Sequence, residues 1–440
     1  MSLSQKVAFN TVVQIVSKVI TVFFTLLTTV LLTSYLGKGG FGDYIYVITL
    51  VIMFGALADW GTATIGVREA AKKVEKQGQI FANILVLRLL LSFLATVLLI
   101  GFAYFVPLKV TRPETLRQAI MVASILLILN VLKASFGIVF QVKLQMQKLA
   151  LTNIVTSGLI FLISCFFVKA GFGLLSLMIA YLLATGFGVL IAGFLASKTV
   201  KFVFVFDKKI LTRLIKESLP MGAILLMFTI DNKIDTVMLG AIKGSESVGI
   251  YGIAYRIYDV LILGSAFLMN ALLPIISQYA DLKKWQTKLQ QIYQKSFDVL
   301  LLMGIGVVGL VWWLAPLMVQ TLTQKRFVEF ADAVWVLRIL SLAMLIAYFN
   351  HLAGYTIVAL GKQRPYFFVA LIALIFNVFA NLFVIPRFSY FGAATVTILT
   401  EALVFLITTF FIFKLLKIIP SFISFPKTVL QLIKQKGKLL

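Results

Sequence analysis

The sequence predicts an all-α integral membrane protein, with 12 transmembrane helices in two six-helix bundles related by a pseudo-two-fold axis along the membrane normal. Two observations on composition point to this class: 61% of the 440 residues are hydrophobic and only 13% are charged. A soluble domain is roughly half apolar and about a quarter charged. A third observation is that the apolar residues fall into twelve segments, each about as long as a membrane crossing.

The twelve predicted spans follow one another through short connections, and each is a mostly apolar run of about 20 residues or more. The N-terminal segment has no small-residue cleavage site after its apolar core, so we interpret it as the first span rather than a removed signal peptide. No connection is long enough for a soluble catalytic domain, and we expect the protein not to be an enzyme. The spans are 10–36, 41–61, 80–106, 116–140, 150–169, 173–196, 217–240, 248–278, 295–320, 333–360, 365–386 and 391–416.

Lys and Arg are unevenly distributed between the two sides of the predicted membrane. The segments on the side of the N-terminus carry 25 of them, those on the other side carry nine, and six lie within spans. Because cytoplasmic loops are enriched in Lys and Arg, both termini are predicted to be cytoplasmic, in a multi-pass protein of the cell (inner or plasma) membrane. Most of the basic charge behind the net +24 then faces the cytoplasmic leaflet, and we expect no nucleic acid partner.

Two turns in different halves of the chain resemble each other. Each has a Leu-Gly pair closing a span, a short Gly-rich stretch, and Gly-x-Tyr opening the next span. Two six-span halves in the same orientation imply the pseudo-two-fold axis, with a substrate site between them near the midplane. The matching positions are Gly37, Gly42 and Tyr44 in the first turn and Gly240, Gly249 and Tyr251 in the second.

This repeat divides the chain into four parts. We expect an N-terminal six-helix bundle at 1–196, a cytoplasmic linker at 197–216, a C-terminal six-helix bundle at 217–416 and a basic cytoplasmic tail at 417–440. The tail is either a basic helix lying on the inner leaflet or a solvated stop-transfer segment.

Few residues are suited to metal or disulfide chemistry. The single cysteine, Cys165, excludes a disulfide framework, and the chain has one histidine and no paired-ligand spacing. We therefore expect no metal site and no cofactor.

Ionisable residues within the spans are the candidate functional residues, because a charge in the bilayer costs at least ~2.5–3.5 kcal/mol unless it is paired, hydrated or close to the interface. In the seventh span Asp231 and Asp235 are four residues apart and share a helix face, whereas Lys233 points elsewhere. We interpret them as lining a wet cavity or coupling transport to an ion. The alternative is a structural ion pair between helices.

The eighth span carries a second group of polar residues. Arg256 and Asp259 are three residues apart, and Tyr251, Tyr255 and Tyr258 lie close to the same face. Aromatic rings suit sugar rings, and a guanidinium group suits phosphate oxygens. The alternative is an intrahelical ion pair beside interfacial tyrosines.

Cations exceed carboxylates within the first six spans. Lys18, Arg88 and Lys133 lie in spans one, three and four, and Asp59 is the one carboxylate predicted within the membrane there. Cations in lipid are accounted for if an anion binds them or if water fills the space. Arg88 and Lys133 have an alternative, because their side chains are close enough to the inner interface to extend into it.

Two further polar residues lie in later spans. Glu401 in span twelve has no local partner, and is either a proton or cation site or the counter-ion of a neighbouring helix. We interpret His351 in span ten as a packed polar residue rather than a proton relay.

Several stretches resemble bacterial and archaeal polysaccharide transporters of the multidrug/oligosaccharidyl-lipid/polysaccharide exporter superfamily, which are O-antigen-type flippases for lipid-linked oligosaccharides. The turn after span four departs from that family: Phe140-Gln141-Val142-Lys143 stands where Phe-Gln-Gly and an acidic residue are common. The most specific motif combines Asn377, Asn381, Ile385-Pro386, Gly392-Ala393-Ala394 and Glu401. The similar stretches are LGKGGFGDYIY and LADWGTATIGVREAAK within 36–72, IDTVMLG and VGIYGIAYRI within 234–257, and ALGKQRPYFF and NVFANLFVIPRFSYFGAATVTILTE within 359–401.

The resemblance implies alternating access through a central cationic cavity, which moves a polyprenyl-(pyro)phosphate-linked oligosaccharide to the outer leaflet for cell-surface polysaccharide biosynthesis. The implied partners are that lipid-linked oligosaccharide, membrane lipids, and a polymerase and glycosyltransferases of the same pathway. The residues implied for substrate binding are Lys18, Arg88, Lys133, Lys233, Arg256 and Tyr255. Those implied for ion coupling or sugar hydrogen bonds are Asp231, Asp235, Asp259 and Glu401.

Three other functions are weighed against this hypothesis. A multidrug cation antiporter of the same superfamily would need an acidic, aromatic cavity, whereas six cations and about five acids lie within these spans. A membrane glycosyltransferase would need a larger loop, and a lipid-II-type flippase typically has more spans.

Overall fold

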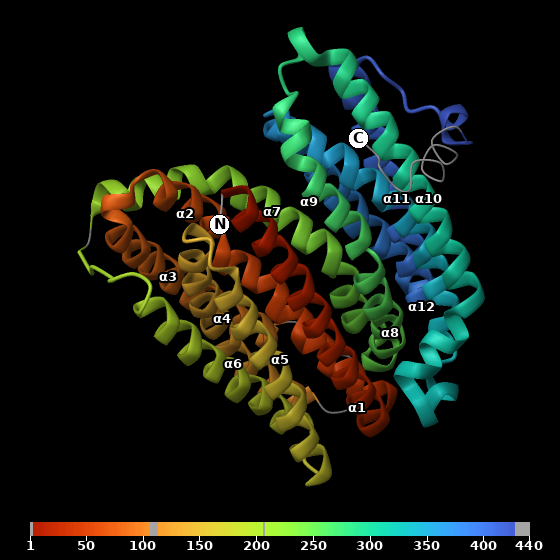
Figure 1. Ribbon diagram of the computed structural model, residues 1–440. Helices are drawn as coiled ribbons and strands as arrows, with labels where there is room; N and C mark the ends of the chain where they lie inside the picture. The colour runs from red at the N-terminus through yellow and green to blue at the C-terminus, as the bar shows by residue number, and fades with distance from the viewer. Residues whose placement is uncertain (1–2, 106–112, 206, 427–440) are drawn as a thin grey trace. The chain divides into compact units, whose positions relative to one another are not determined.

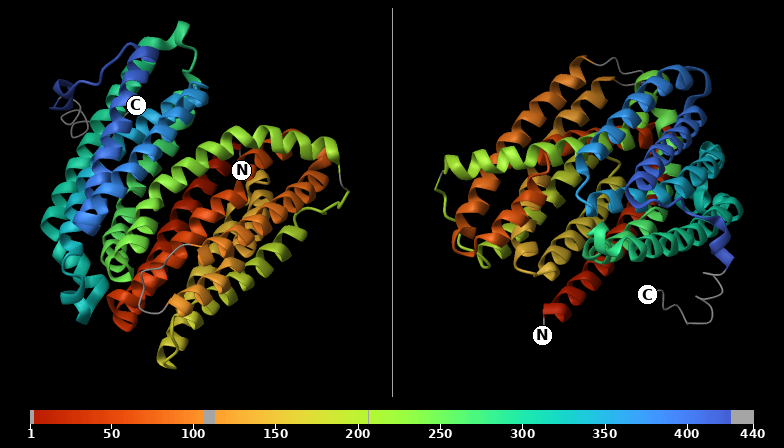
Figure 2. Two further views of the ribbon diagram at one scale, coloured as in Figure 1. Left: turned by 180° about the vertical axis from the view of Figure 1, so that it is seen from behind. Right: turned by 90° about the horizontal axis from the view of Figure 1, so that it is seen from above.

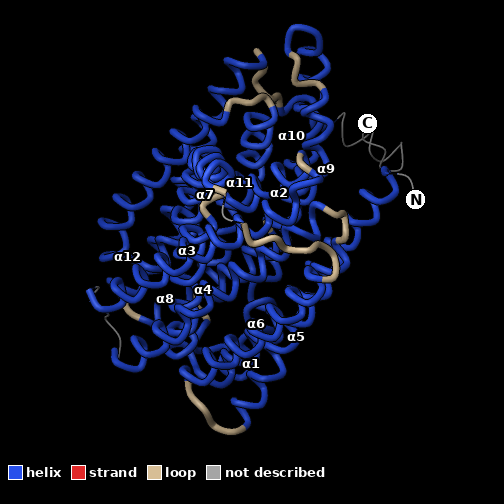
Figure 3. Tube along the Cα trace, turned by 90° about the vertical axis from the view of Figure 1, so that its left-hand side faces the viewer, coloured by secondary structure: helices blue, strands red, loops and turns tan. Residues whose placement is uncertain are grey.

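The computed structural model describes residues 3–105, 113–205 and 207–426, and within these ranges the regular structure is entirely helical (Figure 1). Short loops join the helices, as the trace in Figure 3 shows. The predicted basic tail from Lys427 onwards lies outside the described residues. The elements are α1 (Leu3–Asp59), α2 (Thr62–Lys72), η1 (Val74–Lys76), α3 (Gln77–Phe105), α4 (Pro113–Val142), α5 (Met146–Lys169), α6 (Leu174–Ser197), α7 (Lys208–Lys243), α8 (Ser245–Leu261), α9 (Leu263–Gln278), α10 (Leu282–Thr323), η2 (Gln324–Phe330), α11 (Ala333–Ala359), α12 (Gln363–Leu416) and η3 (Phe422–Ser424).

The predicted spans coincide with helices of the structure. α1 contains the first two spans and is interrupted at Gly37, whose φ of 67° suits glycine. α12 contains the last two and is interrupted at Ser389, where φ is 50°. Within the described ranges nine helical stretches are long and apolar enough to cross a membrane, and those holding α1 and α12 contain two predicted spans each. The all-helical membrane prediction is confirmed.

α7 is the predicted span that is missing from those nine stretches. It is 36 residues long and carries Asp231, Lys233 and Asp235 in its second half. Its partners are α1, α2 and α3. Protein therefore covers part of the helix that charge would otherwise make costly in lipid.

The eighth predicted span is two helices rather than one, because α8 ends at Leu261 and α9 begins at Leu263. The Tyr348 hydroxyl donates to the Leu261 carbonyl oxygen at 2.8 Å, and Ser265 Oγ donates to the Ile262 carbonyl oxygen at 2.9 Å. Side-chain donors thus satisfy carbonyl groups at the break, as a membrane interior requires. His351 Nδ1 lies 2.8 Å from Ser265 Oγ, which fits its interpretation as a packed polar residue.

Contacts divide the chain into two compact units. The first comprises residues 1–249 and 322–326, and the second comprises 250–321 and 327–440. In this division α7 belongs to the first unit. The domain boundary at 197–216 that the sequence suggests stays a prediction.

The segment between α6 and α7 is held against α3 by backbone and side-chain hydrogen bonds. Val203 N donates to the Gly78 carbonyl oxygen at 3.3 Å, and Asn83 Nδ2 donates to the Val205 carbonyl oxygen at 2.9 Å. Asp207 then caps α7, because its Oδ1 accepts from the backbone N–H groups of the next residues. The helix curves along its length and has Pro220 inside it, a residue that removes a helical hydrogen bond (Figure 2).

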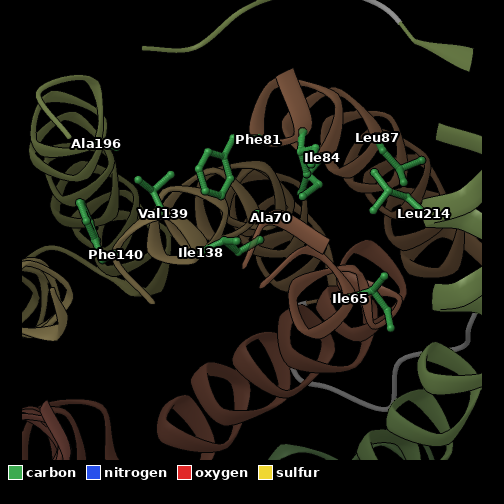
Figure 4. Packing of buried hydrophobic residues seen from close by; sticks show 11 residues of the cluster. Ile65, Ala70, Phe81, Ile84, Leu87, Ile138, Val139, Phe140, Ala196 and Leu214 are labelled. Carbon is green, nitrogen blue, oxygen red and sulfur yellow. The ribbon is translucent and has the colours of Figure 1, made fainter. Parts of the chain in front are cut away.

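The short helix α2 was not predicted from the sequence. It begins after Gly61, which has φ 70°, and it buries Ile65 and Ala70. These two side chains join a core made with α3, α4, α6 and α7, in which Phe81 and Leu214 are also buried (Figure 4). α2 follows α1 in the chain and packs on the start of α7.

The two similar turns pack directly against each other within the first unit. Lys38 Nζ lies 2.8 Å from Glu246 Oε2, and Ser245 Oγ donates to Asp43 Oδ1. A Cβ atom on Gly42 would overlap the Ser245 carbonyl oxygen. A Cβ atom on Gly249 would likewise overlap the Lys38 carbonyl oxygen. At each of these two glycines the backbone of the other turn passes where a side chain would stand.

We expect Gly42→Ala to lower the free energy of unfolding by about 1–3 kcal/mol, because the added methyl group forces two backbones apart. The measurement is the midpoint of thermal unfolding of the purified protein in detergent. Gly186→Ala is the matched control, since nothing lies within 4 Å of a Cβ at that helical position. Equal midpoints for the two variants would contradict the packing described here.

Candidate functional site

The ten candidate site residues are distributed over both units. Tyr255, Arg256, Asp259 and Glu401 belong to the second unit. The first unit holds Lys18, Arg88, Lys133, Asp231, Lys233 and Asp235. Their assignment to one site stays a prediction, and each group is described within its own unit.

Arg88 on α3 is paired with a carboxylate. Its Nη1 lies 2.7 Å from Asp59 Oδ1, at the end of α1, and the side chain is 1% exposed. Sequence reasoning named both residues but had no means of pairing them, because the contact depends on how α1 packs against α3. A cavity of about 310 Å³ has an almost wholly apolar lining, which includes Trp60 and Leu87, the chain neighbours of Asp59 and Arg88.

Lys133 and Lys18 differ from Arg88 in this respect. Neither forms an ion pair within the ranges that the structure describes. Lys133 on α4 is half-buried, and its Cδ lies 3.6 Å from where a Cβ on Gly188 of α6 would stand. Lys18 on α1 is exposed. Both are therefore available to an anion that reaches them.

The three charged residues on α7 differ in how deeply they are buried. Asp231 and Lys233 are half-buried, whereas Asp235 is 2% exposed. Asp235 Oδ1 accepts a hydrogen bond from the Thr236 backbone N–H at 2.6 Å. The shared face predicted for the two carboxylates therefore runs from a half-buried to a fully buried position.

On α8 the tyrosines form a buried ladder. The ring centroids of Tyr251 and Tyr255 are 5.4 Å apart, and those of Tyr255 and Tyr258 are 5.1 Å apart. Arg256 is half-buried, and among the described residues its buried Nε finds no hydrogen-bond acceptor. The guanidinium group thus has donor capacity left for a phosphate oxygen.

Glu401 on α12 is bonded to the neighbouring helix α11. Asn350 Nδ2 donates to Glu401 Oε2 at 2.6 Å and to the Glu401 carbonyl oxygen at 2.9 Å. Farther along α12, Asn381 Nδ2 donates to Asn377 Oδ1 at 2.6 Å, and both asparagines are buried. Polar residues of the most specific sequence motif therefore lie inside the second unit.

Arg338 is a cation that the structure accounts for. Its Nη2 donates to the Trp312 carbonyl oxygen at 3.1 Å, and its guanidinium carbon lies 5.7 Å and 4.7 Å from the ring centroids of Trp312 and Trp335. A cation between two indoles is stabilised without a carboxylate.

An ion-pair cluster between α2 and α7 was missed by the sequence reasoning. Glu69 is buried and lies 3.2 Å from Arg213 Nε, which is also 3.0 Å from Glu217. Arg68 pairs with Glu217 as well. The spacing of Arg213 and Glu217 at i and i+4 was the available signal, but the partner helix α2 was not predicted.

Two family models match the chain. The model described as "Polysaccharide biosynthesis protein" matches residues 7–280, more than half of the chain. The model described as "MatE" matches residues 220–383.

Relatives and solved structures agree with these matches. A "Probable flippase AglR" of Haloferax volcanii is 29% identical over 171 residues, which span 39% of this chain and 35% of that protein. The structure of the lipid II flippase MurJ, inward closed conformation, has TM-score 0.77 and 16% identity, and covers 97% of this chain and 91% of that chain. An inward-facing multidrug resistance MATE family transporter of the MOP superfamily has TM-score 0.71 and 14% identity, with 95% and 96% covered. At such identities the likeness shows the fold, and the predicted fold class is confirmed.

We expect Arg88→Leu to destabilise the protein by about 3 kcal/mol, because it leaves the Asp59 carboxylate without its cation in a largely apolar setting. The double variant Arg88→Leu/Asp59→Asn should recover part of that loss, since it removes both charges. Thermal unfolding of the purified protein measures both.

The ion pair between Arg117 and Glu114, with 76% of the glutamate side chain exposed, provides the control. Arg117→Leu should change stability by less than about 1 kcal/mol. If Arg88→Leu cost no more than this control, the pair with Asp59 would not contribute to folding.

Proposed function

We propose, from the premise that this chain belongs to the polysaccharide biosynthesis protein family of the multidrug/oligosaccharidyl-lipid/polysaccharide exporter superfamily, that it is a flippase for a polyprenyl-(pyro)phosphate-linked oligosaccharide. The cargo moves from the inner to the outer leaflet. The protein alternates between states open to either side, and the glycan passes through water while the polyprenyl chain stays in lipid.

The observation that carries the proposal is the number of cations within spans that lack an acid. Six cations lie within the predicted spans, and the structure shows partners for two of them. Arg88 pairs with Asp59, and Arg338 lies against two indole rings. Lys18, Lys133 and Arg256 have no ion pair with any described residue. Three such cations are costly in lipid, and an anionic headgroup that visits them offsets the cost.

The chemistry of the cargo fits these residues. A (pyro)phosphate carries the negative charge that lysine and arginine neutralise, and guanidinium groups hold phosphate oxygens through two donors at once. Aromatic residues such as Tyr255 provide faces for sugar rings once they become accessible. The carboxylates Asp231, Asp235 and Asp259 provide acceptors for sugar hydroxyls.

The relatives favour the same kind of cargo. One is described as a probable flippase, and a structural neighbour is described as a lipid II flippase. A lipid-linked glycan is an anion with a long apolar tail, so a fold that is shared with a lipid flippase suits it.

The second candidate is a multidrug antiporter, because structural neighbours include multidrug transporters. Cationic drugs require an excess of acids in the cavity. Arg88 already neutralises Asp59, and the other candidate residues of the first unit are three lysines and two aspartates, an excess of one cation. The charge pattern therefore favours an anionic cargo.

We expect Lys18→Gln, Lys133→Gln and Arg256→Gln each to reduce glycan export by about tenfold, the effect of losing one charge-assisted hydrogen bond to phosphate. The measurement is cell-surface polysaccharide together with lipid-linked oligosaccharide retained in the inner leaflet. Lys169→Gln, an exposed lysine at the end of α5, is the matched control. Unchanged export in all three variants would remove the phosphate-binding proposal, and resistance to cationic drugs in place of export would support the antiporter.

We expect Glu401→Gln to abolish any stimulation of transport by an ion gradient, because the amide keeps a hydrogen bond with Asn350 but cannot ionise. Transport is measured in proteoliposomes with and without an imposed proton or sodium gradient. Glu114→Gln, at an exposed position, should behave as the unmodified protein. Stimulation that survives Glu401→Gln would exclude Glu401 as the coupling residue.

A further inference from the structure

A small cationic cavity lies in the first unit, where the end of α2, η1 and α3 meet the beginning of α7. Its volume is about 250 Å³, below the ~300–1,000 Å³ typical of sites for drug-sized ligands. Four cations line it: Lys73, Lys76, Lys209 and Arg213. The size and the charge both suit a small anion.

The two carboxylates that line this cavity are already engaged. Glu69 lies 3.2 Å from Arg213 Nε and 3.7 Å from Lys72 Nζ. Asp207 Oδ1 accepts from the backbone N–H groups of Lys209 at 2.8 Å and Ile210 at 3.2 Å, as the N-cap of α7. Neither acid forms an ion pair with the three remaining lysines of the cavity.

Three lysines at the cavity lack an acidic partner. In the part of the chain that the structure describes, Lys73, Lys76 and Lys209 form no ion pair. They come from two separate stretches of chain, and their mutual repulsion opposes the packing of α7 beside α2 and α3. An anion between them would remove that repulsion.

The floor of the cavity strengthens attraction to an anion. Ile80 and Leu214 line it and are each 2% exposed, so they belong to the packed core of the unit. An apolar wall lowers the local dielectric constant, and charges beside it interact more strongly than in bulk water.

Exposed apolar side chains surround the cavity, as expected of a surface at the membrane interface. Val74 of η1 is 67% exposed, and Phe204, just before α7, is 70% exposed. Val203, Val205 and Ile215 are exposed as well. Exposed apolar residues among lysines are typical of a surface that lies in the lipid headgroup region. The distribution of Lys and Arg predicts this face to be cytoplasmic.

We propose that this cavity binds the phosphate group of a lipid in the adjoining leaflet, an acidic phospholipid headgroup being the ligand. The phosphate bridges Lys73 and Lys76 to Lys209, and so holds the start of α7 against α2 and α3. This site is separate from the proposed cargo path, since none of its lysines is among the residues proposed to contact cargo. It therefore does not depend on the identity of the transported glycan.

The test measures lipid binding by the purified full-length protein in detergent. Phosphatidylglycerol should raise the midpoint of thermal unfolding, whereas phosphatidylcholine should not. The variant Lys73→Gln/Lys76→Gln/Lys209→Gln should need about a hundredfold more phosphatidylglycerol for the same shift, since each lysine near an anionic lipid contributes about fivefold. Replacing the three lysines by arginine should preserve binding.

The matched control is Lys284→Gln/Lys288→Gln/Lys362→Gln, which removes the same charge from exposed positions elsewhere. This control should respond to phosphatidylglycerol as the unmodified protein does. Inorganic pyrophosphate tests the second source of phosphate: protection that is lost in the cavity variant would support the site with a soluble anion as its ligand. An equal loss of lipid response in both triple variants, or no loss in either, would overturn the proposal.

Discussion

The charge on α7 is the constraint on which the arrangement of the first unit depends. A helix that carries Asp231, Lys233 and Asp235 cannot face lipid all round, because each charge left in hydrocarbon costs at least ~2.5–3.5 kcal/mol. α7 packs on α1, α2 and α3, and its Asp235 is buried. This requirement gives a physical reason why α7 joins the first unit, although six predicted spans precede it in the chain.

Glycines allow the backbones of neighbouring segments to approach closely within the first unit. Gly42 and Gly249 allow two turns to meet with no side chain between them, and Gly240 gives room to the ring of Tyr46. In membranes, helix association depends on such packing, because lipid tails are as apolar as leucine and provide little hydrophobic drive. The similarity of the two turns therefore reflects a structural need as well as an internal repeat.

Spans were predictable from the sequence because apolar length is a local property, and Gly37 marked the interruption of α1. Contacts between elements that are distant in the sequence could not be predicted from it. The pairing of Arg88 with Asp59 requires knowing that α3 packs on α1, and α2 is too short and polar to be recognised as a separate helix. The break between α8 and α9 has no glycine or proline at its centre. Its Leu261 carbonyl oxygen accepts a hydrogen bond from Tyr348 of α11, a contact that no local pattern could reveal.

The interruption of α1 at one residue has a geometric consequence for the helix that follows. Because no flexible loop separates the two spans, any change in length between Gly37 and Asp59 is transmitted along the second span. One inserted residue would rotate Asp59 by about 100° around the helix axis and advance it by about 1.5 Å. The phase of that helix, and with it the direction in which its terminal carboxylate points, is thus set by counting residues from a single glycine.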